Sequence, residues 1–331
     1  MPLAGFPIDK RSALLLDKEN MTKYSISPMS SLYELYLRHP RISTDSRRIE
    51  PDSVFFALRG ASFDGNRFAA DALEKGAAYA VVDDPSLPNT RPDKADRLIV
   101  VDDALQTLQA LAREHRRELG LPILAITGSN GKTTTKELVS RVLAEKYEVY
   151  ATRGNLNNHI GVPLTLLAMT RDVEFGIVEM GASACGEIAL LCSIAEPNYG
   201  IVTNIGRAHL EGFGGPEGVR RGKGELYDWL ARTGGRVFVP ANDPVLMSMA
   251  AERETLAAEC YPTTLADGVE HHLEGDYNRF NVAAAVAVGR YFGVDDERIR
   301  YAVGSYRPDN HRSQKNTHRA EYPDSRLLQR Q

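Results

Sequence analysis

The sequence predicts an α/β protein, in which a small N-terminal α/β domain precedes a central domain with a doubly wound, mostly parallel sheet. Two observations predict this fold. From residue 123 onward, short continuous apolar runs alternate with helical segments, as in parallel sheets that helices cover on both faces. A glycine-rich turn joins the first of these strands to the first of these helices, as in a phosphate-binding loop.

The N-terminal domain is expected over residues 21–105, because apolar runs there are short and separated by turn residues. A segment rich in Pro and Asp, 83–97, is predicted to be a surface connection. The expected elements are strands at 53–58, 77–82 and 98–101 and helices over 68–75 and 103–119.

The central domain is expected over residues 106–314. Its apolar runs are continuous rather than alternating, which is typical of strands that are buried on both faces. The expected strands are 123–126, 174–179, 200–203 and 235–239, and the expected helices are 133–146, 186–194, 218–232 and 281–291.

Composition excludes several classes of protein. The chain has 331 residues, of which 43% are hydrophobic and 25% charged, with a formal net charge of −4, so nothing suggests nucleic-acid binding. Its three cysteines fit neither a disulfide framework nor a zinc pattern. No apolar run is long enough to span a bilayer, and residues 1–20 are expected to be a flexible extension rather than a signal peptide. We therefore expect a cytoplasmic protein, and a monomer.

The strongest functional signal is ITGSNGKTTT (126–135), which lies between a predicted strand and a predicted helix. In such a turn the backbone N–H groups point inward at the helix N-terminus and bind phosphates. Gly128 and Gly131 permit the turn, Lys132 would reach the terminal phosphates, and Thr133 would bind Mg²⁺. The general G-x-x-x-x-G-K-[ST] pattern is incomplete, because Ile126 stands at its first glycine. The sequence predicts a nucleotide-binding P-loop here.

Three further residues have both a functional and an ordinary interpretation. Glu179 ends a predicted strand, where a carboxylate faces the phosphate crevice of a parallel sheet; otherwise it is a solvated strand-end acid. His209 follows the next strand and is either a metal ligand or a partly exposed polar residue. Lys223 by itself would be a solvated lysine on a helix.

Several segments together resemble the Mur ligase family over about residues 40–314. Within that family, the segment NNHIGVP (157–163) is most similar to the members that add D-alanyl-D-alanine. The segments that carry the resemblance in the central domain are TGSNGKTTTK (127–136), GNLNNHIGVPLTLL (154–167), VEMGAS (178–183), TNIGRAHLEGFGG (203–215), RGKGEL (221–226) and GDYNRFNVAAAVAVG (275–289). In the N-terminal domain they are STDSR (43–47), FFALRG (55–60) and FDGN (63–66), which resemble the family's UDP-sugar-binding domain. The resemblance thus implies that residues 21–105 are a substrate domain that binds the UDP-linked precursor.

The resemblance implies a reaction. ATP phosphorylates the terminal carboxylate of UDP-N-acetylmuramoyl-tripeptide, and the amine of D-Ala-D-Ala then attacks the acyl phosphate. The product is the pentapeptide precursor of peptidoglycan. Gathering a triphosphate and a carboxylate in one site requires cations, which Lys132 and Mg²⁺ would supply.

The resemblance also implies roles for individual residues, with Lys132, His209 and Lys223 as the catalytic set. Lys223 would be carbamylated by CO₂, which replaces an ammonium group by a metal-binding carboxylate. The implied ATP contacts are Asn281 to adenine, Arg312 to the phosphates, and the loop residues Gly128, Ser129, Asn130, Gly131, Lys132, Thr133 and Thr134. Thr133 and Glu179 would bind one Mg²⁺, and His209 and carbamylated Lys223 would also bind metal. The implied substrate contacts are Thr44, Ser46 and Arg47 to the uridine nucleotide, with Asn157 and Asn158 also binding substrate.

The sequence departs from the family at two places. The family has more strand-forming sequence where this chain has the short, weakly patterned stretch 243–275, so the far edge of the central sheet is not predicted. The family also has a third, Rossmann-like domain that opens with a strand resembling LIVDxYNAN, which we expect to be absent. One back-translation of residues 315–331, shifted by one base, reads KTRTAQNTLIVDCYNA. We therefore interpret 315–331 as a non-native, frameshifted tail.

The leading interpretation is thus a ligase whose turnover is impaired. The competing interpretations are a catalytically inactive remnant that binds ATP, and a sibling amide ligase. The sibling would be either the tripeptide-forming Mur enzyme or a protein similar to folylpolyglutamate synthetase.

Overall fold

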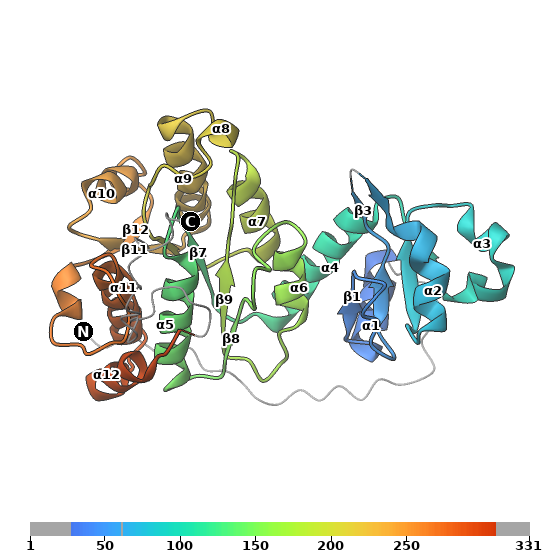
Figure 1. Ribbon diagram of the computed structural model, residues 1–331, viewed down its shortest axis with the longest axis horizontal. Helices are drawn as coiled ribbons and strands as arrows, with labels where there is room; N and C mark the ends of the chain where they lie inside the picture. The colour runs from blue at the N-terminus through green and yellow to red at the C-terminus, as the bar shows by residue number, and fades with distance from the viewer. Residues whose placement is uncertain (1–27, 61, 309–331) are drawn as a thin grey trace, which may run out of the picture.

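The computed structural model describes residues 28–60 and 62–308. The predictions for 1–20, Arg312 and 315–331 lie outside this part of the chain. The fold is α/β, as the sequence predicts, and contains two mostly parallel sheets (Figure 1).

The larger sheet has six parallel strands in the order β12-β11-β10-β7-β9-β8. The predicted P-loop follows β7, an interior strand of this sheet. Of the other predicted site residues, Glu179 ends the neighbouring strand β9 and His209 follows the neighbouring strand β10. The strands are β7 (Ile123–Thr127), β8 (Val149–Ala151), β9 (Phe175–Glu179), β10 (Tyr199–Val202), β11 (Arg236–Pro240) and β12 (Ala257–Tyr261).

Helices cover both faces of this sheet because successive strand residues point to opposite sides. Leu124 and Ile126 pack in the cluster with α5, α11 and α12, whereas Ile123 and Ala125 pack in the cluster with α4, α6, α7 and α9. The helices are α4 (Ala104–Leu119), α5 (Lys132–Ala144), α6 (Gly161–Leu167), α7 (Glu187–Ala195), α8 (Leu210–Phe213), α9 (Pro216–Thr233), α10 (Pro244–Ala251), η3 (Thr263–Ala266), α11 (Asn278–Tyr291) and α12 (Asp296–Ser305).

The smaller sheet has four parallel strands in the order β1-β2-β5-β6. A short antiparallel pair, β3–β4, lies beside it. Its elements are α1 (Pro28–Arg38), β1 (Ile42–Ser43), β2 (Val54–Phe56), β3 (Arg59–Gly60), β4 (Phe63–Asp64), η1 (Gly65–Phe68), α2 (Ala69–Glu74), β5 (Tyr79–Val82), α3 (Leu87–Thr90), η2 (Pro92–Arg97) and β6 (Leu98–Val100).

Helix α4 joins the two sheets into one core (Figure 1). Its buried residues belong to a hydrophobic cluster that contains Val54 and Phe56 of the smaller sheet and Ile123 of the larger one. Buried polar contacts reinforce this junction. The Tyr36 hydroxyl donates to the Leu167 carbonyl at 2.6 Å and lies 3.3 Å from His115 Nε2, which is 2.8 Å from the Met169 carbonyl.

Every strand and helix predicted from the sequence is present, within a few residues at its ends. The predicted surface connection 83–97 contains α3 and η2, and none of its residues is buried. The weakly patterned stretch 243–275 does supply the far edge of the sheet, because β12 pairs in parallel with β11. Among the described residues, we find no helix with the length and apolar character that a bilayer span requires.

Candidate functional site

The P-loop is shaped by two glycines and by the loop that follows β10. Gly128 has φ 139°, and a Cβ atom there would lie 2.0 Å from Thr203 Oγ1. Gly131 has φ 78° and precedes the first residue of α5. The Ser129 N–H donates to the Asn204 carbonyl at 3.1 Å, and the Asn130 N–H donates to Asn204 Oδ1 at 3.1 Å. The neighbouring strand therefore holds the turn in place.

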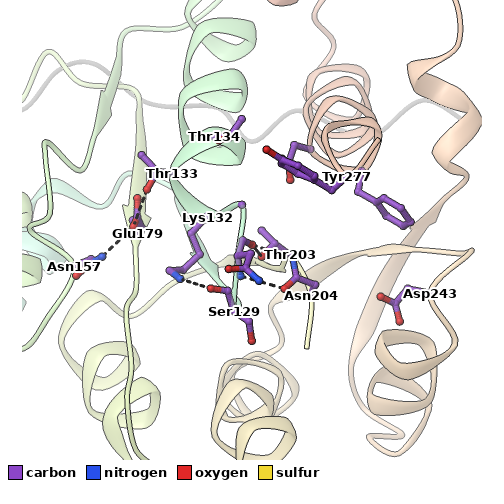
Figure 2. Close-up of a pocket in the computed structure, with 14 residues that line it drawn as sticks. Ser129, Lys132, Thr133, Thr134, Asn157, Glu179, Thr203, Asn204, Asp243 and Tyr277 are labelled. Atoms are coloured by element: carbon purple, nitrogen blue, oxygen red, sulfur yellow. Dashed lines mark hydrogen bonds between the residues drawn. The ribbon is translucent and has the colours of Figure 1, made fainter. Parts of the chain in front are cut away.

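Lys132, Thr133 and Glu179 lie together at the start of α5 and the end of β9. Lys132 Nζ donates to the Gly128 carbonyl at 2.8 Å, so the ammonium group folds back over the P-loop. The Thr133 hydroxyl donates to Glu179 Oε1 at 3.3 Å, and Asn157 Nδ2 donates to the same oxygen at 2.9 Å. Figure 2 shows these contacts on one side of the cavity.

The second oxygen of Glu179 has no partner among the described residues. Glu179 is 2% exposed, and its Oε2 atom is buried without a hydrogen bond, as is the nearby strand-end hydroxyl of Thr127. A buried carboxylate oxygen without a partner is costly unless a cation satisfies it. Mg²⁺ in nucleotide sites typically takes one or two protein oxygens and completes its shell with phosphates and water. The donor set of Thr133 and Glu179 therefore fits Mg²⁺, although the described residues contain no group of three or more His, Cys, Asp or Glu able to hold a metal.

A cavity of about 840 Å³ opens above the P-loop. One side carries Lys132, Thr133 and Glu179, and the other carries Asp243 and Tyr277 (Figure 2). Its full lining is Ser129, Asn130, Gly131, Lys132, Thr133, Thr134, Asn157, Glu179, Thr203, Asn204, Asp243, Tyr277, Phe280 and Asn281. The predicted phosphate loop, Glu179 and Asn281 are thus brought to one cavity.

Sequence reasoning missed five lining residues: Thr203, Asn204, Asp243, Tyr277 and Phe280. Four of them lie in segments that carry the family resemblance, at the end of β10 and at the start of α11. Asp243 had only a local signal, since an Asp before Pro is typical of a helix N-cap.

A second hollow of about 530 Å³ adjoins the first and shares Lys132 and Asn157 with it. His209 lines this hollow, is exposed, and has φ 56°, a conformation that non-glycine residues adopt infrequently. Asn158 also lines it, but Asn158 Oδ1 accepts from the Gly161 N–H at 2.8 Å and so helps to cap α6.

Lys223 lies next to this hollow and is 2% exposed. Its Nζ donates to the Ala182 carbonyl at 3.2 Å and lies 5.1 Å from the centre of the Phe213 ring. Burial, together with the positive charge of Lys132, lowers the pKa of Lys223 from 10.5 to about 8. The amine is therefore much more readily neutral than a surface lysine, which is the opposite of the solvated lysine that its spacing alone suggested.

Thr44, Ser46 and Arg47 lie elsewhere, in the loop after β1 of the smaller sheet. None of them lines either cavity. Arg47 is exposed and forms a bidentate pair with Asp45 at 2.9 and 2.8 Å, and its hydrogen bonds lower the pKa of Asp45 to about 2. Lys75 Nζ donates to the Ser46 carbonyl at 2.9 Å.

Two family profiles match the chain. The Mur ligase middle domain matches residues 126–267, which contain the P-loop, Glu179, His209 and Lys223, and the catalytic domain of the Mur ligase family matches residues 40–116. The chain belongs to the Mur ligase family.

Relatives within the family point to one member. The UDP-N-acetylmuramoyl-tripeptide–D-alanyl-D-alanine ligase of Bacillus subtilis is 37% identical over 77% of this chain and 59% of its own length. The ligase of the same name from Synechocystis is 36% identical over 80% of this chain and 61% of its own length. The chain thus spans about three fifths of the length of these curated relatives.

Solved structures give the same result. A crystal structure of MurF from Acinetobacter baumannii superposes with a TM-score of 0.71 at 31% identity, covering 81% of this chain and 63% of that one. MurF from Thermotoga maritima in complex with ADP superposes with a TM-score of 0.68 at 27% identity, covering 82% and 67%.

Proposed function

We propose that this chain binds ATP and the UDP-linked precursor in a ligase reaction that joins D-Ala-D-Ala to UDP-N-acetylmuramoyl-tripeptide through an acyl phosphate. The observation that carries the proposal is the unpartnered Glu179 oxygen beside Lys132 and Thr133, in a cavity large enough for a nucleotide. The names of the relatives support the choice of substrates. Because the reaction consumes ATP, the proposed location is the cytoplasm. The proposed substrates are small molecules, and the proposed reaction involves no nucleic acid.

Each residue of the P-loop has a physical role in this proposal. The backbone N–H groups of 128–134 and the N-terminus of α5 would bind the ATP phosphates. Lys132 would leave its two carbonyl partners, since a phosphate oxygen is the better acceptor for an ammonium group. Thr133 and Glu179 would hold Mg²⁺, which neutralises phosphate charge and polarises the transferred phosphoryl group.

Lys223 is proposed to carry a carbamate. Its depressed pKa leaves a substantial fraction of neutral amine near neutral pH. The nitrogen of the neutral amine forms a bond to the carbon of CO₂ and releases one proton, which gives a carbamate with one negative charge. Counted from the ammonium form, which must first lose a proton of its own, two protons are released and a positive charge is replaced by a negative one. The new carboxylate would remove the repulsion between Lys223 and Lys132 and could hold metal together with His209 at the second hollow.

The precursor is proposed to extend from the smaller sheet to the second hollow. Thr44, Ser46 and Arg47 would bind its uridine nucleotide, and Asn157 and Asn158 would bind its reacting end. Asn157 suits this role because its amide contacts Glu179 and its side chain lines both cavities. Arg312, which lies outside the described residues, remains a proposed contact to the ATP phosphates.

Phosphate release measured with ATP, Mg²⁺, UDP-N-acetylmuramoyl-tripeptide and D-Ala-D-Ala tests the proposal. The proposal is supported if phosphate release requires both D-Ala-D-Ala and UDP-N-acetylmuramoyl-tripeptide and if mass spectrometry detects the pentapeptide product. meso-Diaminopimelate, lysine and glutamate serve as alternative acceptors, and a preference for any of them would contradict the assignment. ATP binding without amide formation under any condition would favour a nucleotide-binding remnant instead.

A further inference from the structure

A third hollow, of about 740 Å³, lies at the amino ends of the strands in the larger sheet, opposite the P-loop. Its lining includes Arg116, Arg117 and Arg236, and we call it the arginine hollow. Strand β10 begins in this hollow at Tyr199 and ends beside Thr203, which lines the cavity above the P-loop. At about 3.3 Å per strand residue, about 13 Å separates the two sites. None of the described residues assigned above to ATP, metal or the precursor lines the arginine hollow.

The arginine hollow carries an excess of positive charge, although the whole chain has a formal net charge of −4. Its three arginines face one carboxylate among the described residues that line it, that of Glu196. Arg117 Nε donates to both oxygens of Glu196 at 3.1 Å, so these two charges compensate each other. Arg236 Nη1 lies 3.7 Å from Glu259, which is too far for a hydrogen bond. Arg116 and Arg236 therefore supply the excess.

Arg116 is held in place by the fold and still has donors to offer. It is 8% exposed, its Nε donates to the Ala195 carbonyl at 3.0 Å, and its Nη2 donates to the Glu196 carbonyl at 2.9 Å. These bonds close the C-terminal end of α7. A guanidinium group has five N–H donors, and Nη1 of Arg116 has no acceptor among the described residues. Burial lowers the pKa of Arg116, so its charge is incompletely compensated.

Asn198 brings the two arginines together. Its Oδ1 accepts from Arg116 Nη2 at 2.9 Å, and its carbonyl accepts from the Arg236 N–H at 3.0 Å. Both guanidinium groups therefore belong to one end of the hollow, at the start of β10 and β11.

Aromatic rings lie beside these charges. The guanidinium group of Arg236 is 5.5 Å from the centre of the Tyr291 ring, and that of Arg232 is 5.0 Å from the centre of the Trp229 ring. Trp229 Nε1 donates to the Pro197 carbonyl at 3.3 Å, which fixes the indole, and Tyr291 is 39% exposed. Rings next to guanidinium groups bind planar groups by stacking while the cations attract negative charge.

We propose that the arginine hollow binds a small anion that carries a planar ring, with Arg116 and Arg236 contacting the anionic group and Trp229 and Tyr291 flanking the ring. A hollow of this volume is within the usual range for small-molecule sites. The anionic group is a phosphate or a carboxylate, since guanidinium groups bind both. The inference does not depend on the proposed function, because the two sets of residues are separate.

Intrinsic fluorescence of the full chain tests the proposal, because Trp229 is its single tryptophan and lines this hollow. The four probes are uridine monophosphate, which has a ring and a phosphate, orotate, which has a ring and a carboxylate, uridine, which has no anionic group, and inorganic phosphate, which has no ring. Uridine monophosphate or orotate is expected to change the emission of Trp229 to saturation, and to bind at least about tenfold more tightly than uridine or phosphate. The tighter of the two ring-bearing anions identifies the anionic group.

Two variants assign the contacts. Arg236→Gln should weaken the tighter probe about tenfold, because it removes a charge-assisted hydrogen bond. Its matched control is Arg298→Gln, since Arg298 is also partly exposed, lies 4.0 Å from Asp295 and does not line the hollow. Tyr291→Ala should weaken the same probe about tenfold through lost stacking. Its control is Tyr301→Ala, since Tyr301 is 69% exposed and lies outside the hollow. Thermal unfolding checks that each variant is folded.

The inference is overturned if neither uridine monophosphate nor orotate changes the emission of Trp229, or if uridine or phosphate alone binds as tightly as they do. It is also overturned if either Arg236→Gln or Tyr291→Ala binds the probe as the wild type does. A response that Lys132→Ala abolishes would place the ligand at the P-loop and would equally contradict the inference.

Discussion

Burial of the Lys223 amine should make the stability of this protein depend on pH. The folded pKa is about 8, against 10.5 for an unperturbed lysine. Between these two values the unfolded chain binds a proton that the folded chain does not, so the free energy of unfolding rises with pH. At about 1.4 kcal/mol per pH unit, the full gain is about 3.5 kcal/mol. Below about pH 8 the whole penalty for burying the charge is present.

The assay is urea unfolding of the metal-free chain at several pH values from neutral to above 10.5, with CO₂ excluded. Lys223→Met should lack the rise that the wild type shows. Lys136→Met is the matched control, because Lys136 is also buried but has Glu137 at 3.1 Å, and it should keep the rise. Adding bicarbonate near pH 8 should stabilise the wild type and leave Lys223→Met unchanged.

Three results would refute this reasoning. The first is a wild-type stability that is flat or falls between about pH 8 and about pH 10.5 relative to Lys223→Met. The second is an equal rise in both proteins, which would place the titrating group elsewhere. The third is an equal response of both proteins to bicarbonate, which would remove the support for a carbamate on this lysine.

Three further substitutions have expected outcomes. Gly128→Ala should destabilise the chain by about 1–3 kcal/mol and weaken ATP binding, because φ is 139° and the new Cβ atom would lie 2.0 Å from Thr203 Oγ1. Thermal unfolding measures the loss of stability. A loss no larger than that of Gly154→Ala, whose new Cβ atom meets nothing within 4 Å, would contradict this prediction. Glu179→Gln should reduce the Mg²⁺ enhancement of ATP binding about tenfold or more in calorimetry; unchanged enhancement would exclude Glu179 as a ligand. Tyr36→Phe should cost about 1–3 kcal/mol in urea unfolding because it leaves the Leu167 carbonyl unpaired; a loss no greater than that of Tyr33→Phe would count against it.

The parts of the fold that depend on local signals could be predicted from the sequence. The strand, turn and helix around the P-loop are specified by an apolar run and by two glycines that adopt positive φ. Strand β12 could not be predicted, because as an edge strand it alternates between exposed and half-buried residues and has no continuous apolar run. The joining role of α4 also depends on contacts from both sheets.

The candidate site shows the same division. The proximity of Lys132, Thr133 and Glu179 could be predicted from the sequence, because the carboxyl ends of parallel strands lie at one edge of the sheet. The sequence could not predict that Asp243 and Tyr277 line the same cavity, because their elements are brought close together only by the order of the strands in the sheet. Which hydrogen bonds Asn281 makes, and how strongly burial acts on Lys223, are likewise properties of the packed structure.

The shared core at α4 limits how such a chain can be divided or recombined. The helix packs against α1 of the smaller sheet and against α6 and α7 of the larger one, so a cut on either side of it exposes an apolar face. An N-terminal unit from another protein could therefore replace residues 28–103 only if it brought side chains that fit the existing surface of α4. The packing of α4, rather than the linkers on either side of it, therefore constrains where such a chain can be fused to another protein or exchange a domain with one.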